Sequence, residues 1–228
     1  VGERQVEVLG GLELADGRRI LDGISSWWVN LFGHNHPRLN AALTAQAAEL
    51  EQVIFAGFTH EPAARLAAEL VALAPLGLTR VFFSDDGSTA VEVAMKMAIQ
   101  QWRQRGEGRR RLFVALEHAY HGDTFGAMAA GGDAVFHGVF ADLLCDVLRA
   151  PVPASEREVP GALAALEALL DRAGDEVAAV IVEPIVQAAG GMRIHPASFL
   201  RGVRAATRER GMPPVADEIY TGFGRTGR

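Results

Sequence analysis

Several residue types are scarce in this 228-residue sequence, and each scarcity excludes a class of protein. A single cysteine, Cys145, has no partner here for a disulfide, which excludes a disulfide-stapled fold and favours the reducing cytoplasm. Its apolar neighbours, ADLLCDVL, predict a buried structural thiol. No apolar run is long enough to cross a bilayer, and no signal-peptide pattern stands at the start. We therefore expect a cytoplasmic protein without a membrane partner.

Basic residues are not in excess, and lysine is nearly absent. The net charge is −6 at pH 7 and is spread along the chain, which leaves no basic patch for nucleic acid. Lys96 is the only lysine. Chemistry that needs a lysine amine must therefore use Lys96 or a lysine from outside this sequence.

What the chain does have is 49% apolar residues, arranged in alternating strand-like and helix-like segments. Residues 5–24 alternate apolar and polar around Asp16-Gly17, which predicts an antiparallel hairpin. Strands are predicted over 79–84, 111–116, 176–184 and 213–219. Helices are predicted over 38–51, 62–74, 88–105 and 196–210. This order predicts an α/β fold, a mostly parallel sheet with helices on both faces.

Polar residues follow each of the four predicted strands. The segments are Asp85–Ser88, the stretch EHAYHGD that begins at Glu117, Glu183-Pro184 and Asp217-Glu218. Ligands of open parallel sheets bind beyond the carboxyl ends of the strands. We therefore predict the functional site at this edge of the sheet.

The first of these turns has two interpretations. Gly87 would let the backbone approach a ligand closely, and Ser88 stands at a helix N-terminus, where free N–H groups and the helix dipole favour phosphate. Ser88 would equally serve as the N-cap of the helix. The turn alone does not decide between them.

Asp217 ends a predicted buried strand, where an unpaired carboxylate costs several kcal/mol. It therefore needs a cation. Arg225 is the only candidate nearby in sequence, and the alternative is a cation on a ligand, such as a protonated pyridine nitrogen. Trp27 and Trp28 are adjacent, and on an extended strand they would face opposite ways, one into the core and one onto a pocket wall.

Two further patterns are weak. GFGRTG, residues 222–227, matches the dinucleotide fingerprint in letters but lacks the tight strand–turn–helix context. The histidine pairs His34 with His36 and His118 with His121 have no strong metal-ligand spacing, so no metal site is predicted.

Seven stretches, in a consistent order, resemble the class III, fold-type I aminotransferases, which use pyridoxal 5'-phosphate (PLP). They are SSWW, GHNHPRLNAAL, FTHEPAARLA, VFFSDDGSTAVEVAMKMAIQQW, YHGDTFGAM, IVEPIVQAAGGM and ADEIYTGFGRTGR. The resemblance implies the PLP-dependent transferase fold of type I and a homodimer. It also implies that residues 1–24 belong to a small domain and residues 25–228 to the first part of a large PLP-binding domain.

The resemblance assigns roles to residues already singled out. Asp217 would pair with the pyridinium nitrogen of PLP, and Gly87 and Ser88 would hold its phosphate. Tyr120 would cover one face of the ring and Ile219 the other. The resemblance also implies that the substrate is bound by Trp27, Trp28, Tyr120 and Arg225. Asp123 and Glu183 would orient their neighbours.

The resemblance also implies what this sequence lacks. The Schiff-base lysine of the family follows GFGRTG by a short distance, so the sequence is expected to be an internal fragment that is inactive alone. Lys96 does not match that position. Asp86 stands where the family usually has serine, and a carboxylate beside a phosphate is unfavourable.

Within the class, the paired tryptophans and the absence of glutamate at Ala189 favour one branch. Its members transfer an amino group from S-adenosylmethionine to 7-keto-8-aminopelargonic acid (KAPA) in biotin biosynthesis. The alternatives are an ω-amino-acid aminotransferase that uses pyruvate or 2-oxoglutarate, and a non-catalytic domain that binds PLP or phosphate.

Overall fold

The computed structural model describes residues 10–132 and 137–227. Residues 5–9 of the predicted hairpin, residues 1–9 of the predicted small-domain segment, and Arg228 lie outside the described residues. The chain forms two compact units, Val1–Phe82 and Phe83–Arg228. The domain boundary predicted between residues 24 and 25 remains a prediction. In the described part, no helix combines the length and apolar character needed to span a membrane.

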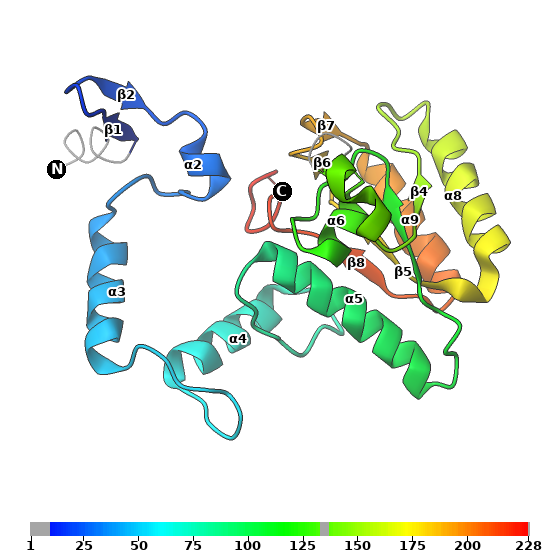
Figure 1. Ribbon diagram of the computed structural model, residues 1–228, viewed down its shortest axis with the longest axis horizontal. Coiled ribbons are helices and arrows are strands. Elements are labelled where there is room, and N and C mark those ends of the chain that lie inside the picture. Colours follow the sequence, from blue (N-terminus) through cyan, green and yellow to red (C-terminus); the bar gives the residue numbers. More distant parts are fainter. Residues whose placement is uncertain (1–9, 133–136, 228) are drawn as a thin grey trace. The chain divides into compact units, whose positions relative to one another are not determined.

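From residue 10 onward, the N-terminal unit contains a hairpin and three short or medium helical elements (Figure 1). Strands β1 (Gly11–Glu13) and β2 (Arg19–Leu21) pair antiparallel around Gly17, which has a φ of +83°, as the sequence predicts for this part of the hairpin. Helices α3 (Pro37–Glu49) and α4 (Glu61–Leu73) each carry a proline in the first turn.

The segment α2 (Ser25–Trp28) is a single left-handed turn. All four residues have positive φ, between 48° and 72°, although none is glycine. Each such residue costs about 1–2 kcal/mol, so the turn needs support from its surroundings. The expectation of an extended segment with opposed indoles is wrong, because the Trp27 and Trp28 rings stack with centroids 5.4 Å apart.

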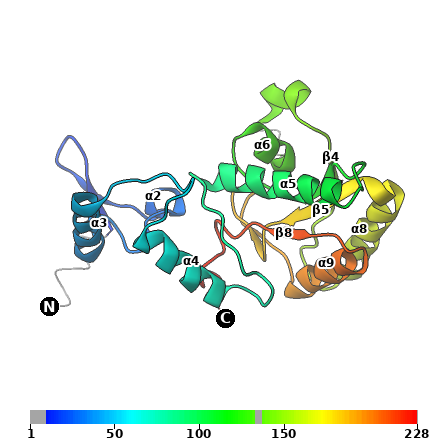
Figure 2. The same ribbon diagram turned by 90° about the horizontal axis from the view of Figure 1, so that it is seen from below.

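The C-terminal unit is built on a four-stranded parallel sheet of order β4-β3-β5-β8. The strands are β3 (Leu112–Leu116), β4 (Val147–Ala150), β5 (Val177–Val182) and β8 (Pro214–Ala216). The helices are α5 (Gly87–Gln104), α6 (Phe125–Gly131), α8 (Val159–Ala173) and α9 (Ala197–Glu209). Figure 2 shows α5 and α6 on one side of the sheet and α8 and α9 on the other, which confirms the predicted α/β arrangement. Short elements complete it: η1 (Gly138–Leu143), η2 (Gly174–Glu176), β6 (Val186–Gln187) and β7 (Arg193–Ile194).

The core of this unit forms around β5, every residue of which is buried. This is what a continuous apolar run predicts for a strand covered on both faces. The buried indole of Trp102 donates from Nε1 to the Ala178 carbonyl at 2.7 Å, and the Arg110 guanidinium lies 4.2 Å from the centre of its ring. These contacts fix α5, and hence its N-terminus, against the sheet.

Two further predictions about the fold are wrong. Residues 79–84 form no strand, because a strand needs a hydrogen-bonded neighbour and none of the four strands of the sheet pairs with them. Cys145 is exposed rather than buried, since it follows the short helix η1 at the surface. Pro160 lies in the first turn of α8, a position where its missing N–H is not needed.

Candidate functional site

The site lies where β3, β5 and β8 end. These strands are parallel neighbours, so the residues that follow them meet at one edge of the sheet. Asp217 follows β8, Glu183 follows β5, and the loop 117–124 follows β3. The structure joins all three: the Tyr120 backbone N–H donates to Glu183, and His121 donates to Asp217.

Asp217 is paired with His121 in the interior. His121 Nδ1 lies 2.6 Å from Asp217 Oδ2, and the residues are 2% and 8% exposed respectively. The second carboxylate oxygen, Oδ1, accepts the Ile219 N–H at 3.1 Å. The partner that Asp217 needs within the chain is therefore His121 and not Arg225, whose guanidinium lies 5.0 Å from the ring centre of Tyr220.

Glu183 connects the loop after β3 to the loop after β5 through hydrogen bonds from both loops. Its Oε1 accepts the Tyr120 N–H and its Oε2 accepts the Ala188 N–H, both at 3.1 Å. Its own carbonyl oxygen accepts from His195 Nε2 at 2.9 Å. Burial raises the pKa of Glu183 to about 7, against the lowering effect of these N–H donors and of His121. A buried titratable carboxyl therefore stands beside the His121–Asp217 pair.

The side chains of Tyr120 and Asp123 are joined to the start of α5. The Tyr120 hydroxyl donates to Asp123 Oδ2 at 2.7 Å, and the Asp123 N–H donates to Ser88 Oγ at 2.9 Å. His137 stacks on Tyr120, and its Nε2 lies 3.3 Å from Asp123 Oδ1. Burial, and then the hydrogen bond to Asp123, raise the pKa of Tyr120 to about 12. Tyr120 therefore stays neutral at ordinary pH.

The N-cap of α5 is Asp86, so the interpretation of Ser88 as the cap is wrong. The Asp86 carboxylate accepts the Thr89 N–H at 2.8 Å, and the Thr89 hydroxyl accepts the Asp86 N–H at 3.0 Å, a complete capping box. Among residues 10–132 and 137–227, nothing accepts the N–H groups of Gly87 and Ser88. Two free donors at the positive end of an 18-residue helix have the chemistry that suits an anion.

Gly87 and Ile219 lie against each other, although they are far apart in sequence. A methyl group on Gly87 would lie 2.7 Å from Ile219 Cδ1, closer than side-chain carbons approach in proteins. Ile219 is two residues after Asp217 and is 62% exposed. The segment after β8 therefore adjoins the start of α5.

This donor set suits a phosphorylated pyridine. The free N–H groups of Gly87 and Ser88 match a phosphate, and the buried carboxylate of Asp217 matches a protonated ring nitrogen. Ile219, between them, offers an apolar surface for a flat ring. Lys96 is exposed on α5, about 12 Å along the helix axis from Ser88, so it does not join this group. Trp27 and Trp28 belong to the N-terminal unit.

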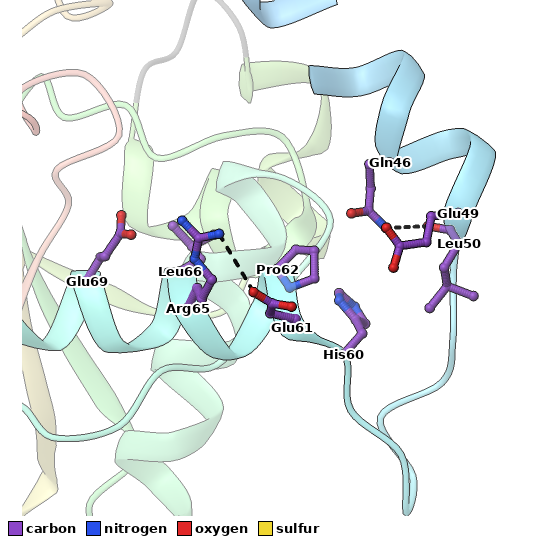
Figure 3. Close-up of a pocket in the computed structure, with 9 residues that line it drawn as sticks. All are labelled: Gln46, Glu49, Leu50, His60, Glu61, Pro62, Arg65, Leu66 and Glu69. Carbon is purple, nitrogen blue, oxygen red and sulfur yellow. Dashed lines mark hydrogen bonds and ion pairs between the residues drawn. The ribbon is translucent and has the colours of Figure 1, made fainter. Parts of the chain in front are cut away.

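A pocket in the N-terminal unit is less suited to an anion. It lies between α3 and α4, and its lining includes Glu49, Glu61 and Glu69 against one arginine, Arg65 (Figure 3). Arg65 is 3.8 Å from Glu61 and so is already partly neutralised. The three glutamates would repel a phosphate in this pocket, whereas the free N–H groups at the start of α5 would attract one.

Sequence reasoning missed His121 as the partner of Asp217, and also His137 and His195. His121 was considered only as a metal ligand. The available signal was its place in the loop that follows the predicted strand 111–116. Asp217 needs a cation, and the only lysine of the sequence lies in a helix.

The chain is similar to known proteins over almost its whole length. The family model described as aminotransferase class-III matches residues 9–228. The adenosylmethionine-8-amino-7-oxononanoate aminotransferase of Synechococcus elongatus is 53% identical over 95% of this chain and 52% of its own length. The crystal structure of the enzyme of the same name from Methanocaldococcus jannaschii has a TM-score of 0.90 and 39% identity, covering 96% of this chain and 49% of that one. A thermostable (S)-enantioselective ω-transaminase from Thermomicrobium roseum has a TM-score of 0.89 and 32% identity, covering 96% and 52%.

Proposed function

Because this chain belongs to the class-III aminotransferase family, we propose that the whole protein transfers an amino group from S-adenosylmethionine to KAPA, giving 7,8-diaminopelargonic acid in biotin biosynthesis. The observation that carries the proposal is the 53% identity, over 95% of the chain, to a relative named for this reaction. The fold is that of the type I PLP-dependent transferases, and PLP is the family's cofactor. The chain spans about half the length of the curated relatives it matches.

Gly87, Ser88, Asp217, Tyr120 and Ile219 would hold the cofactor. The two N–H groups at the start of α5 would bind the phosphate, and Asp217 would accept a hydrogen bond from the pyridine nitrogen. Tyr120 would cover one face of the ring, with Ile219 on the other. When bound, PLP supplies an electron sink for the carbanion formed at the amino-bearing carbon.

The remaining residues of the site orient these groups. His121 donates to Asp217 and so fixes the orientation of its carboxylate. Glu183 holds the Tyr120 backbone, and Asp123 holds both the Tyr120 hydroxyl and Ser88. This network fixes the ring-covering tyrosine relative to the phosphate site.

The substrate side of the proposal involves Trp27, Trp28, Tyr120 and Arg225. The stacked indoles offer a broad apolar wall, and Arg225 offers a cation suited to a carboxylate. Proton transfer at the reacting carbon needs an amine base, and Lys96 on the exposed face of α5 is not proposed for it. We propose that the Schiff-base lysine serves as this base and lies in the part of the whole protein outside this sequence.

One observation favours a second candidate. The ω-transaminase of Thermomicrobium roseum is also similar in fold, at 32% identity, so an aminotransferase that uses an ω-amino acid with pyruvate or 2-oxoglutarate is the alternative. Both candidate functions act on small-molecule substrates. A homodimer and a cytoplasmic location complete the proposal, and sedimentation and cell fractionation test them.

An amino-donor screen tests the proposed reaction. The full-length protein, loaded with PLP, is incubated with KAPA and either S-adenosylmethionine or L-alanine, and the diamine is measured by mass spectrometry. We expect diamine with S-adenosylmethionine only. Pyruvate-dependent turnover of ω-amino acids, with no diamine from S-adenosylmethionine, would assign the protein to the second candidate.

A further inference from the structure

The left-handed turn of α2 carries both tryptophans of the proposed substrate wall. Ser25, Ser26, Trp27 and Trp28 all have positive φ, a backbone conformation that side chains with a Cβ rarely adopt. Strain of this kind persists only where the surrounding structure over-determines it, and it clusters at functional sites. The question is which side chain holds the turn in place.

Asp22 is the side chain on which the contacts of this turn converge. Its Oδ2 accepts the Ser26 hydroxyl at 2.9 Å and His34 Nε2 at 2.8 Å. Its carbonyl accepts the Ser25 N–H at 3.2 Å, which starts the turn. The side chain is only 7% exposed, and hydrogen bonds from Ser26, first from its backbone, together with His34, lower the pKa of Asp22.

The network closes on the far side of the tryptophans through Asn30. The Asn30 side-chain amide lies 3.1 Å from His34 Nδ1, and the Asn30 N–H donates to the Ser25 carbonyl at 3.0 Å. Because the amide donates to Nδ1, the His34 proton resides on Nε2, which donates to Asp22. Residues on both sides of Trp27-Trp28 are thus joined through one carboxylate.

We propose that Asp22 is a positioning residue for substrate: through Ser26 and His34 it holds the left-handed turn that keeps the Trp27 and Trp28 rings stacked as the apolar wall of the substrate pocket. The inference rests on the proposed function, in which these indoles meet substrate. In this proposal Asp22 acts through the turn and not by direct contact with substrate. Without its carboxylate, the turn relaxes toward ordinary backbone conformations and the ring stack is lost.

The test compares Asp22→Asn with a matched control in the full-length protein. Asp16→Asn makes the same change at another aspartate of this unit, one that pairs with Arg18 on the hairpin and not with the turn. The first readout is the exciton couplet of the stacked indoles in circular dichroism, assigned by its loss in Trp27→Phe. The second is KM against kcat with KAPA and S-adenosylmethionine.

We expect Asp22→Asn to lose most of the couplet and to raise KM about tenfold, the effect of losing a hydrogen bond to a charged group, with kcat changed less. Asp16→Asn should match the wild type in both readouts. Ser26→Ala removes one hydroxyl and should weaken the couplet and raise KM to a smaller extent than Asp22→Asn. If Asp22→Asn does not fold, Ser26→Ala is the variant that tests the inference.

Two results overturn the inference. One is a couplet retained in Asp22→Asn and in Ser26→Ala. The other is a lost couplet with KM unchanged, since the turn would then have no part in substrate binding. Failure of the proposed function looks different, because the wild type itself would then form no diamine while the couplet still depended on Asp22.

Discussion

His121 and Asp217, 96 residues apart in sequence, are joined in the interior by a hydrogen bond of 2.6 Å between Nδ1 and Oδ2. The pair links the loop after β3 to the end of β8, and it supplies the partner that a buried carboxylate requires. Within the part of the chain that the structure describes, Oδ1 of Asp217 has a single donor, the Ile219 N–H. The carboxylate therefore keeps acceptor capacity for a ligand.

Removal of the imidazole should destabilise the protein. In His121→Ala the Asp217 carboxylate stays buried without its partner, which typically costs about 3–5 kcal/mol. His121→Asn keeps a donor near the position of Nδ1 and should cost less. The free energy of unfolding in urea, measured without PLP, separates the two. Equal stability of His121→Ala and the wild type would show that the pair does not stabilise the fold.

Glu183 should make stability depend on pH. Burial raises its pKa from 4.5 to about 7, so between these values the folded chain holds a proton that the unfolded chain has released. The stability contributed by this group therefore falls as pH rises through that window and levels off above it, by about 3 kcal/mol in all. Glu183→Gln lacks the titration. From pH 5 to pH 8 the wild type should therefore lose stability relative to Glu183→Gln, measured as the free energy of unfolding of each. A difference between the two proteins that stays constant with pH would contradict the prediction.

Asp86 should weaken phosphate binding at the start of α5 by charge repulsion. Asparagine caps helices as well as aspartate does, so Asp86→Asn keeps the helix N-cap and removes one negative charge. We expect PLP to bind about threefold to tenfold more tightly at low salt, with the gain shrinking as salt is added. Asp142→Asn, an exposed change on η1, is the control. A gain that does not respond to salt would exclude the electrostatic cause.

Gly87 and Ile219 should be energetically coupled. Gly87→Ala places a methyl group 2.7 Å from Ile219 Cδ1 and should weaken PLP binding by crowding the ring site. Ile219→Val removes that carbon. In the double variant most of the affinity should return, with a coupling of about 1 kcal/mol in a double-mutant cycle of PLP affinities. Strictly additive effects would mean that the two side chains do not share the site.

Much of the C-terminal unit follows from local sequence patterns. The apolar run 176–184 predicts a strand covered on both faces, which the structure has over 177–182. The periodic segment 88–105 predicts a helix, which the structure has as α5 at nearly the same bounds. Glu183 and Asp217 could be placed at one sheet edge because parallel strands end together. Gly87 and Ser88 were expected at that edge after a strand, 79–84, that does not form. These features depend on periodicity and on topology, both of which are visible in one sequence.

Other features depend on contacts that local pattern does not carry. Residues 79–84 are β-prone, yet strand formation is decided by a hydrogen-bonding neighbour. The left-handed turn at 25–28 contradicts the preferences of serine and tryptophan, and it is held by Asp22 and His34 from outside the turn. The His121–Asp217 pair joins two loops far apart in sequence, so no spacing predicts it.

The most direct test of this site is the affinity of the full-length protein for PLP, compared between wild type and Asp217→Ala. The account predicts one PLP per chain for the wild type, detected by intact mass after borohydride reduction. It predicts a dissociation constant about 10- to 100-fold higher for the variant, the effect of losing a charge-assisted hydrogen bond to the ring. Equal PLP affinity in the two proteins would contradict the assignment of Asp217 and with it the site at this edge of the sheet.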